Sequence, residues 1–424
     1  MSNEIKREIE EIQIPLELHR RSKMGIQQAL SEYKGNKRIV KKWANRRILA
    51  ASVLVVIILS SAVFNTQVLA TIQKALQYIP GIGTVVEDDA PQERYVLDQP
   101  ISTEVDGGSL VVTGMVVDDE MTYITMNGTN VEKYQSVKLV NGKGEEYTIK
   151  SSQMVWGSNG KWTGSYWHEG KLDLKGQMKL IIAENPEIVI PLTLNKAKSF
   201  DRYQDMGGTA AVNGVTITAI ANKMDGLARV ALVSQQPKDL KIIDFGIDGV
   251  HEDKRLYVAD VAGKVYPIQY DWGLSNPVRE FYFDLSGSDG KTYNMTIPEI
   301  NVTYDDKVKL SLDIPSHGVI DVEKSFEIAG FPATITKLER INDDQLRLYV
   351  NLNYNEQTSK SLHNFRIDSM SHMAKINEQT KELEYLEFDI KPNSKKVKIT
   401  LTEPEVIIRG PWKFELPYDK YFSN

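Results

Sequence analysis

The stretch that decides the fold is DGGSLVVTGMVVDDEMTYITM, residues 106–126. β-Branched and other apolar residues alternate with small or polar residues on both sides of the acidic run Asp118-Asp119-Glu120. Successive side chains of a strand point to opposite faces, so this period is typical of strands, and an acidic run between two of them is typical of a turn. The stretch therefore predicts two strands joined by a turn.

The same pattern recurs twice, as NGVTITAIANKMDGLARVAL in residues 213–232 and AGFPATITKLERINDDQLRLYVNL in residues 329–352. A Pro-Glu dipeptide opens a later apolar run in each repeat, at Pro186, Pro298 and Pro404. These markers recur about every 110 residues, which is the size of an immunoglobulin-like sandwich. We expect a mainly β chain with three tandem immunoglobulin-like β-sandwich modules at 94–198, 199–315 and 316–424. Two larger β domains are the alternative.

Upstream of the repeats, Ile48–Gln73 contains no charged residue, and its apolar centre Ile48–Phe64 has 17 residues. This length is at the lower limit for crossing a bilayer. The preceding Lys34–Arg47 holds seven Lys or Arg and no acid, which predicts a cytoplasmic N-terminus and extracellular β modules. We expect one transmembrane helix at 48–70 in the cell membrane. A cleaved signal peptide is the alternative, but the long region before the apolar run favours a retained anchor.

The segments flanking this span have helical periodicity. Residues 1–47 predict a cytoplasmic amphipathic and basic segment, with a short helix over 16–33 whose apolar stripe includes Leu18, Ile26 and Leu30. This stripe needs a protein groove or membrane lipid to cover it, so these three residues are the expected partner-binding anchors. Residues 71–93 predict a juxtamembrane helix and linker, because Leu76 and Ile79 continue the helical spacing.

Composition narrows the possible functions. Residues 1–47 hold 12 basic and 6 acidic side chains, whereas the remainder holds 39 basic and 51 acidic ones within a net charge of −6. An acidic outer part argues against nucleic acid or a polyanionic wall polymer as its main partner. The chain has no cysteine, which excludes disulfides, thiolate metal sites and cysteine nucleophiles, and is common in exported Gram-positive proteins.

No catalytic motif stands out. The sequence contains no HExxH, GxSxG, Walker or Rossmann pattern, so we expect no enzyme, no cofactor and no metal site. His363 and His372 could meet across a hairpin near Asp368, but solvated surface histidines are the expected explanation. Paired aspartates such as Asp305-Asp306 are expected at turns.

A cluster of aromatic residues lies in WGSNGKWTGSYWHEG, residues 156–170. Trp156, Trp162 and Trp167 could present aromatic faces to a sugar or a peptide. Packing within or between modules is the more common role of such residues. The cluster is therefore a candidate ligand-binding site, and packing within or between modules is the alternative.

Together these features resemble the Gram-positive anti-sigma-factor-like single-pass membrane proteins that carry an uncharacterised extracellular domain and a C-terminal immunoglobulin-like module. The resemblance rests on Ile14-Pro15-Leu16-Glu17-Leu18, the basic stretch to Arg47, and ILSSAVFNTQVLATIQKALQYIPGIGTVVE in residues 58–87. The strand pair from Asp106 and the module from about Gly318 complete it. The zinc-binding His/Cys signature of the better-known anti-sigma domain is absent.

The resemblance implies a regulatory protein whose inner helices bind an extracytoplasmic-function sigma factor and whose outer modules sense the cell-wall space. Cleavage or rearrangement near residues 66–90 would release the partner. A surface adhesion or scaffold protein, or a protein binding a cell-wall glycan through Trp156, Trp162 and Trp167, is the alternative.

Overall fold

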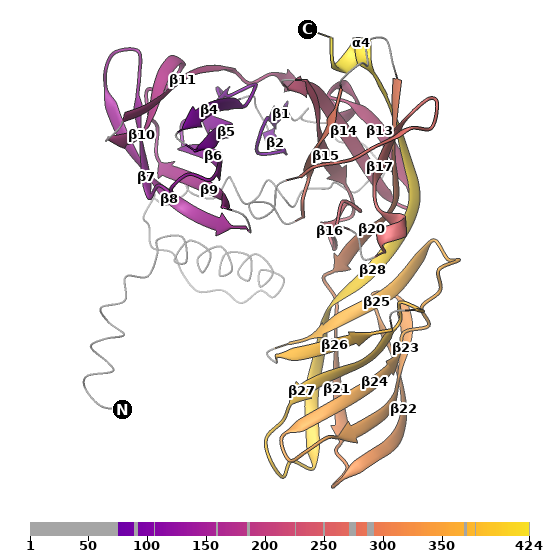
Figure 1. The fold of residues 1–424 in the computed structure, drawn as a ribbon. Coiled ribbons are helices and arrows are strands. Elements are labelled where there is room, and N and C mark those ends of the chain that lie inside the picture. Colours follow the sequence, from indigo (N-terminus) through magenta and orange to yellow (C-terminus); the bar gives the residue numbers. More distant parts are fainter. Residues whose placement is uncertain are drawn as a thin grey trace, which may run out of the picture.

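The computed structural model describes residues 75–423, except 89–91, 106, 158–159, 185–186, 225, 249–250, 271–276, 286–291, 369–370 and 378. This part of the chain is mainly β (Figure 1), and its α-helical content is α4 (Tyr418–Tyr421). Within it, no helix has both the length and the apolar character needed to span a membrane. The expected inner segment 1–47 and transmembrane helix 48–70 lie outside the described residues.

The first sheet has nine strands in the order β3-β11-β10-β7-β8-β9-β6-β5-β4. All nine lie within 94–198. The strands are β3 (Tyr95–Val96), β4 (Ile101–Val105), β5 (Gly108–Val117), β6 (Met121–Thr129), β7 (Ser136–Val140), β8 (Glu146–Trp156), β9 (Lys161–Glu169), β10 (Gly176–Glu184) and β11 (Glu187–Lys196). Because β3 pairs with both β11 and β5, the sheet closes into a barrel-like enclosure around its own apolar core.

A hairpin precedes this sheet and lies between it and the rest of the molecule (Figure 1). It consists of β1 (Ala75–Ile79) and β2 (Thr84–Asp88), and β1 also pairs with β12 (Ser199–Phe200). One face, with Leu76 and Val85, packs against later residues that include Tyr203, Met206, Ile220 and Val233. The other face, with Ile79 and Val86, packs against the first sheet, on Val96, Val116 and Met121 of its strands and on Ala197, which follows β11. Both faces of the hairpin are therefore buried.

The predicted juxtamembrane helix is wrong for residues 75–79, which form β1. A strand with one solvated face alternates apolar and polar residues, but β1 is buried on both faces and lacks that signal. Its apolar residues Leu76 and Ile79 happen to be spaced as on a helix. Tertiary burial, which local spacing does not report, decides the conformation.

After β12 and the short turn η1 (Tyr203–Asp205), a four-stranded sheet runs in the order β13-β14-β15-β19. Its strands are β13 (Gly208–Val212), β14 (Val215–Met224), β15 (Leu227–Gln235) and β19 (Glu280–Asp284). A seven-stranded sheet belongs to the same apolar core. It contains β16 (Leu240–Asp244), β17 (Tyr257–Asp260), β18 (Val265–Tyr266), β20 (Thr292–Tyr304), β21 (Lys307–Asp313), β25 (Lys360–Ile367) and β28 (Lys396–Pro417).

The last sheet runs in the order β22-β23-β24-β27-β26. Its strands are β22 (Gly318–Ile328), β23 (Phe331–Arg340), β24 (Gln345–Asn351), β26 (His372–Ile376) and β27 (Leu383–Asp389). The long strand β28 pairs with β21 and β25 in its first half and with β20 in its second half, and it runs the length of this region (Figure 1). The stretches 199–315 and 316–424 consequently share one sheet and one apolar core.

Candidate functional site

The expected partner-binding anchors Leu18, Ile26 and Leu30 lie outside the described residues. The three tryptophans of the aromatic cluster are described, and they lie in different environments. Trp162 is 2% exposed in the core of the first sheet, and its indole N–H donates to the carbonyl of Val131 at 3.0 Å. Trp167 packs half-buried beside the hairpin.

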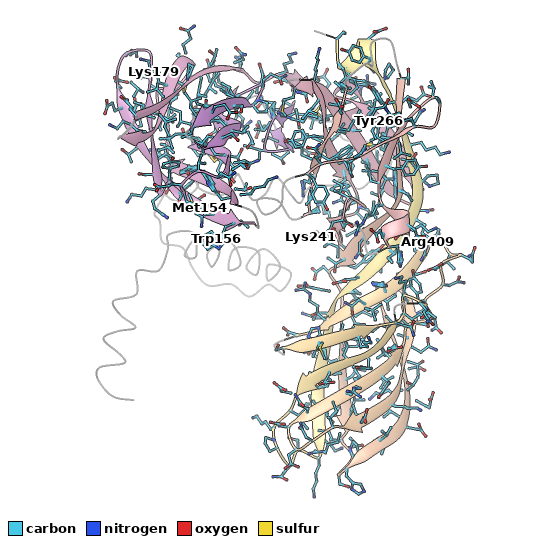
Figure 2. All side chains as sticks on the ribbon, viewed as in Figure 1. Met154, Trp156, Lys179, Lys241, Tyr266 and Arg409 are labelled. Atoms are coloured by element: carbon cyan, nitrogen blue, oxygen red, sulfur yellow. The ribbon has the colours of Figure 1, made fainter. Side chains whose placement is uncertain are left out.

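Trp156 is the member of this cluster that reaches the surface. It ends β8, the residue is 65% exposed, and the Lys133 ammonium lies 4.2 Å from its ring centroid. Figure 2 shows Trp156 beside Met154 at the rim of the first sheet. Among the described residues of this cluster, Trp156 therefore has the one exposed indole, whereas Trp162 packs in the core of the first sheet.

The expectation that His363 is a solvated surface histidine is wrong. Its side chain is buried, with 4% exposure, on the strand β25. His372 lies on β26, which pairs with β27 in a different sheet, so no hairpin joins the two histidines. His363 instead lies beside His251, with ring centroids 6.2 Å apart. Burial, helped by the charges of His251 and Arg409, lowers the pKa of His363 to about 4.

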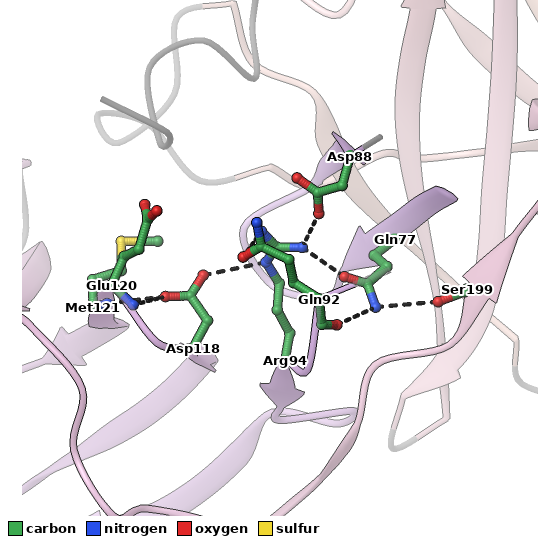
Figure 3. Close-up of polar contacts among 8 residues, drawn as sticks. All are labelled: Gln77, Asp88, Gln92, Arg94, Asp118, Glu120, Met121 and Ser199. Atoms are coloured by element: carbon green, nitrogen blue, oxygen red, sulfur yellow. Dashed lines mark hydrogen bonds and ion pairs between the residues drawn. The ribbon is translucent and has the colours of Figure 1, made fainter. Parts of the chain in front are cut away.

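Two polar sites emerge from the described residues. The first, which we call the hairpin clamp, is the hydrogen-bonded set Gln77, Asp88, Arg94, Asp118 and Ser199 (Figure 3). Arg94 is 1% exposed at the start of the first sheet. Its guanidinium donates to Gln77 Oε1 at 2.6 Å and to Asp118 Oδ2 at 3.2 Å, and it also pairs with Asp88.

The other members of the clamp complete the network. Gln77 Nε2 donates to Ser199 Oγ at 3.2 Å, which links β1 to β12. Asp118 Oδ1 accepts the backbone N–H groups of Glu120 and Met121, both at 2.9 Å. A buried arginine is tolerated because each nearby charge is paired and hydrogen-bonded. The clamp therefore fixes the hairpin to the first sheet through charges that water does not screen.

The opposite face of the hairpin is held by a second set of polar side chains. Tyr203 donates its hydroxyl to Glu87 Oε1 at 2.8 Å. Tyr78 lies beside Arg229 of β15 and Glu280 of β19, and burial together with the Glu280 charge raises the pKa of Tyr78. The Arg229 side chain is fully buried, with its Nε 3.5 Å from Glu280 Oε1. Residues 75–88 are thus anchored on both sides.

The second site, which we call the junction pocket, is a cavity of about 330 Å³. The segment carrying His251 and η2 (Glu252–Lys254), the strand β20, the turn after β24 and the strand β28 surround it. His251 Nδ1 lies 2.5 Å from Glu299 Oε1, and His251 Nε2 lies 3.4 Å from the Tyr354 hydroxyl. Arg409, labelled in Figure 2, lies on β28 and lines this pocket.

A β-bulge shapes this pocket. Between the pairs Ile297–Trp412 and Glu299–Arg409, β28 places Gly410 and Pro411 opposite Pro298 alone. A Cβ on Gly410 would lie 2.6 Å from the Ile297 carbonyl oxygen, so only glycine fits this close approach. Bulges re-aim neighbouring side chains, and here Glu299 and Arg409 both line the cavity.

Sequence reasoning missed both sites. His251, Glu299, Tyr354 and Arg409 are separated by tens of residues, and no local spacing announces their meeting. The bulge dipeptide Gly410-Pro411 was the available signal, because a proline inside a strand run is confined to edges and bulges. Among the described residues, no group of three or more His, Asp or Glu side chains is arranged to hold a metal ion.

Comparison with known proteins adds little to this geometry. No family model matches the chain, and none of the curated proteins matches it. One solved structure, described as the crystal structure of the conserved domain protein from Bacillus anthracis, is 11% identical over 73% of this chain and 89% of its own. Its TM-score of 0.18 is too low to support any argument about fold or function.

Proposed function

We propose that this chain is a membrane-anchored regulatory protein of the anti-sigma-factor type. Residues 1–47 would lie in the cytoplasm and bind a sigma factor through Leu18, Ile26 and Leu30. The β region would lie outside and respond to the cell-wall space. The observation that supports this proposal is the hairpin 75–88, which follows the expected span 48–70 after four residues and is buried on both faces.

A flexible stalk would let the outer part and the span move independently. The hairpin instead ties the exit of the span to the packing of two β regions, through the hairpin clamp on one face and Tyr203 and Tyr78 on the other. A change in the packing of the β regions would then reach the membrane segment through the hairpin. In this proposal the hairpin is the element with two arrangements, packed and released, that such coupling needs. Release of the hairpin would be the switching step.

We also propose that 199–315 and 316–424 are immunoglobulin-like modules joined through the sheet and core that they share, and that 94–198 folds as a separate module. The four-stranded sheet and the seven-stranded sheet, to which the third stretch contributes β25 and β28, enclose a common core, and this supports a sandwich arrangement for the second module. Expression of 94–198 alone tests the first boundary. A cooperative unfolding transition is expected, and a non-cooperative one would contradict an independent module.

The partner is tested by co-purification of the full-length protein from membranes. The variant Ile26→Asp plus Leu30→Asp places two charges on the apolar stripe, and Gln27→Asp plus Gln28→Asp places the same charges beside it. The first variant should lose a sigma-type protein that the wild type and the second variant retain. Equal recovery in all three samples would disprove binding through the stripe.

The coupling is tested separately with Asp88→Asn, which weakens the hairpin clamp without touching residues 1–47. We expect less sigma-type partner on this variant, because a loosened hairpin mimics the released state. The matched control is Asp98→Asn, which changes an exposed aspartate two residues after β3 and outside the clamp. If Asp88→Asn recovers as much of the sigma-type partner as the wild type does, the proposed coupling is wrong. The proposals for the membrane anchor and for the partner-binding stripe would not be affected by that result.

A wall-glycan-binding role is the second candidate, and the exposure of Trp156 favours it. Aromatic faces stack on sugar rings, and the Lys133 ammonium beside this indole could add a polar contact. Retention of the full-length protein on purified cell wall should then fall in Trp156→Ala. Retention equal to the wild type would exclude Trp156 as the binding residue.

A further inference from the structure

The junction pocket has the size and construction of a ligand site. Its volume of about 330 Å³ lies at the lower end of the range for small-molecule sites. It is built by segments far apart in the sequence, from His251 to Pro411. Several of its lining residues, including Glu299, Arg409 and the bulge residues Gly410 and Pro411, lie on or between paired strands of the β framework.

Two of the four charged side chains of the pocket, Arg409 and Glu299, are held in place before any ligand arrives. Arg409 Nη1 donates to the Thr358 carbonyl at 2.9 Å and to Ser361 Oγ at 3.0 Å, and Nη2 donates to the Tyr354 hydroxyl at 3.0 Å. Glu299 has a side-chain exposure of 8%, and His251 holds one of its carboxylate oxygens. Because these side chains are already ordered, less conformational entropy is lost when a ligand binds.

The pocket contains both signs of charge. Lys254 and Arg409 supply two cations, and Glu299 and Glu356 supply two anions. A purely anionic ligand would face two carboxylates, and a purely cationic ligand would face an ammonium and a guanidinium. An apolar ligand would desolvate these charges without compensation. A ligand with a cation and an anion of its own satisfies both pairs.

We propose that the junction pocket binds a small zwitterion, an amino acid or a short peptide with free ends. Its ammonium group is received by Glu299 and Glu356, and its carboxylate by Lys254 and Arg409. The Tyr354 ring and Pro411 supply the less polar wall for the remaining atoms. This site belongs to the outer β region, and its occupation does not depend on the cytoplasmic partner proposed above.

The junction pocket lies between two stretches of the chain. Glu299 belongs to β20, Tyr354 follows β24 and Arg409 belongs to β28, so a ligand would bridge strands of the two stretches 199–315 and 316–424. Binding that contacts both would favour the packed arrangement over any opened one, because a ligand shifts a population only through differential affinity. The ligand would therefore stabilise this junction.

The test is isothermal titration calorimetry of the full-length protein in detergent micelles with four probes. Alanine and alanylalanine carry both charges, and they distinguish an amino acid site from a peptide site. N-Acetylalanine lacks the ammonium group, and alaninamide lacks the carboxylate. We expect one of the first two probes to bind and the corresponding single-charge probes to bind roughly tenfold or more weakly, since each loses a charge-assisted contact.

Two exposed residues give variants that leave the buried network intact. Lys254→Gln and Glu356→Gln should each weaken the binding of the zwitterion severalfold. Lys309→Gln is the matched control, because Lys309 pairs with Thr400, nine residues along β28 from Arg409. Absence of binding by both zwitterions, equal affinity for the single-charge probes, or unchanged affinity in both pocket variants would overturn the proposal.

Discussion

Arg94 Nε lies 3.2 Å from Asp118 Oδ2, and the two side chains are 2% and 3% exposed. Arg94 precedes the first sheet and Asp118 follows β5, so the contact joins the entry of this sheet to its first long hairpin. The same guanidinium reaches Gln77 and Asp88 of the hairpin 75–88. One buried cation thus holds together three segments of the chain.

Arg94→Ala should lower the free energy of unfolding by about 3–5 kcal/mol, because it leaves the buried Asp118 carboxylate without its counter-charge. Urea denaturation followed by tryptophan fluorescence measures the loss. The control is Arg202→Ala, whose partner Asp205 lies 2.9 Å away but whose side chain is 71% exposed. An exposed pair of this kind is worth at most about 1 kcal/mol. Equal losses in the two variants would show that the clamp contributes no more than a surface pair.

Gly81→Ala should displace the hairpin from the first sheet. Gly81 has φ of +73°, and a Cβ there would lie 1.9 Å from the Thr113 carbonyl oxygen, a contact that no rotamer change can relieve. Hydrogen exchange of residues 75–88 should therefore become faster. Gly214→Ala is matched in conformation, with φ of +86° and no atom within 4 Å, so it carries the backbone strain alone. Hairpin exchange that is equally slow in both alanine variants would contradict the close approach at Gly81.

Strands could be predicted from the sequence where the run of β-branched and apolar residues is clear, both in strands that are mostly buried, such as β5, and in strands with one exposed face, such as the start of β28. The stretch 106–126 forms β5 and β6 as expected, and Val215–Ile220, Leu346–Leu352 and Lys396–Leu401 each fall on or across a strand. The alternation of apolar and polar residues did not predict β1, because both faces of this strand are covered. It also carries no information on which sheets share β28, because pairing between strands far apart in the sequence depends on the whole fold.

The candidate sites were less predictable than the strands. Trp162 and Trp156 are six residues apart, equally aromatic and directly paired across β8 and β9, yet one is buried and the other exposed. His251 and Glu299 are 48 residues apart and meet only because β20 and the segment before η2 fold against each other. Residue type indicated neither the burial of His363 nor the charge balance of the junction pocket.

Stability should fall in acid because of His363. Burial lowers the pKa of this side chain from 6.5 to about 4, so between these values the unfolded chain binds a proton that the folded chain excludes. The free energy of unfolding should decrease as the pH falls through this window, by about 3 kcal/mol in total. His363→Gln removes this contribution, and urea midpoints measured from pH 7 to pH 4 give the difference between the two proteins.

Other groups also change their protonation in acid, and the comparison with His363→Gln accounts for them. Burial raises the pKa of Asp244 and of Glu405, so these carboxyls bind protons more readily in the folded chain than in the unfolded chain and oppose the loss of stability in acid. They are present in both proteins and cancel in the difference. A difference that does not change between pH 7 and pH 4 would mean that His363 is solvated or charged in the folded protein.

The tryptophans of the aromatic cluster should differ sharply in what they contribute to stability. Trp162→Ala removes a buried indole and its hydrogen bond to Val131, and it should cost about 3–5 kcal/mol of unfolding free energy. The paired residue gives the control, since Trp156→Ala removes an exposed ring and should stay within about 0.5 kcal/mol. Urea denaturation followed by circular dichroism avoids the loss of fluorophore. A large cost for Trp156→Ala would place that indole in a packed interface rather than in solvent, and it would remove the basis for a sugar-binding role.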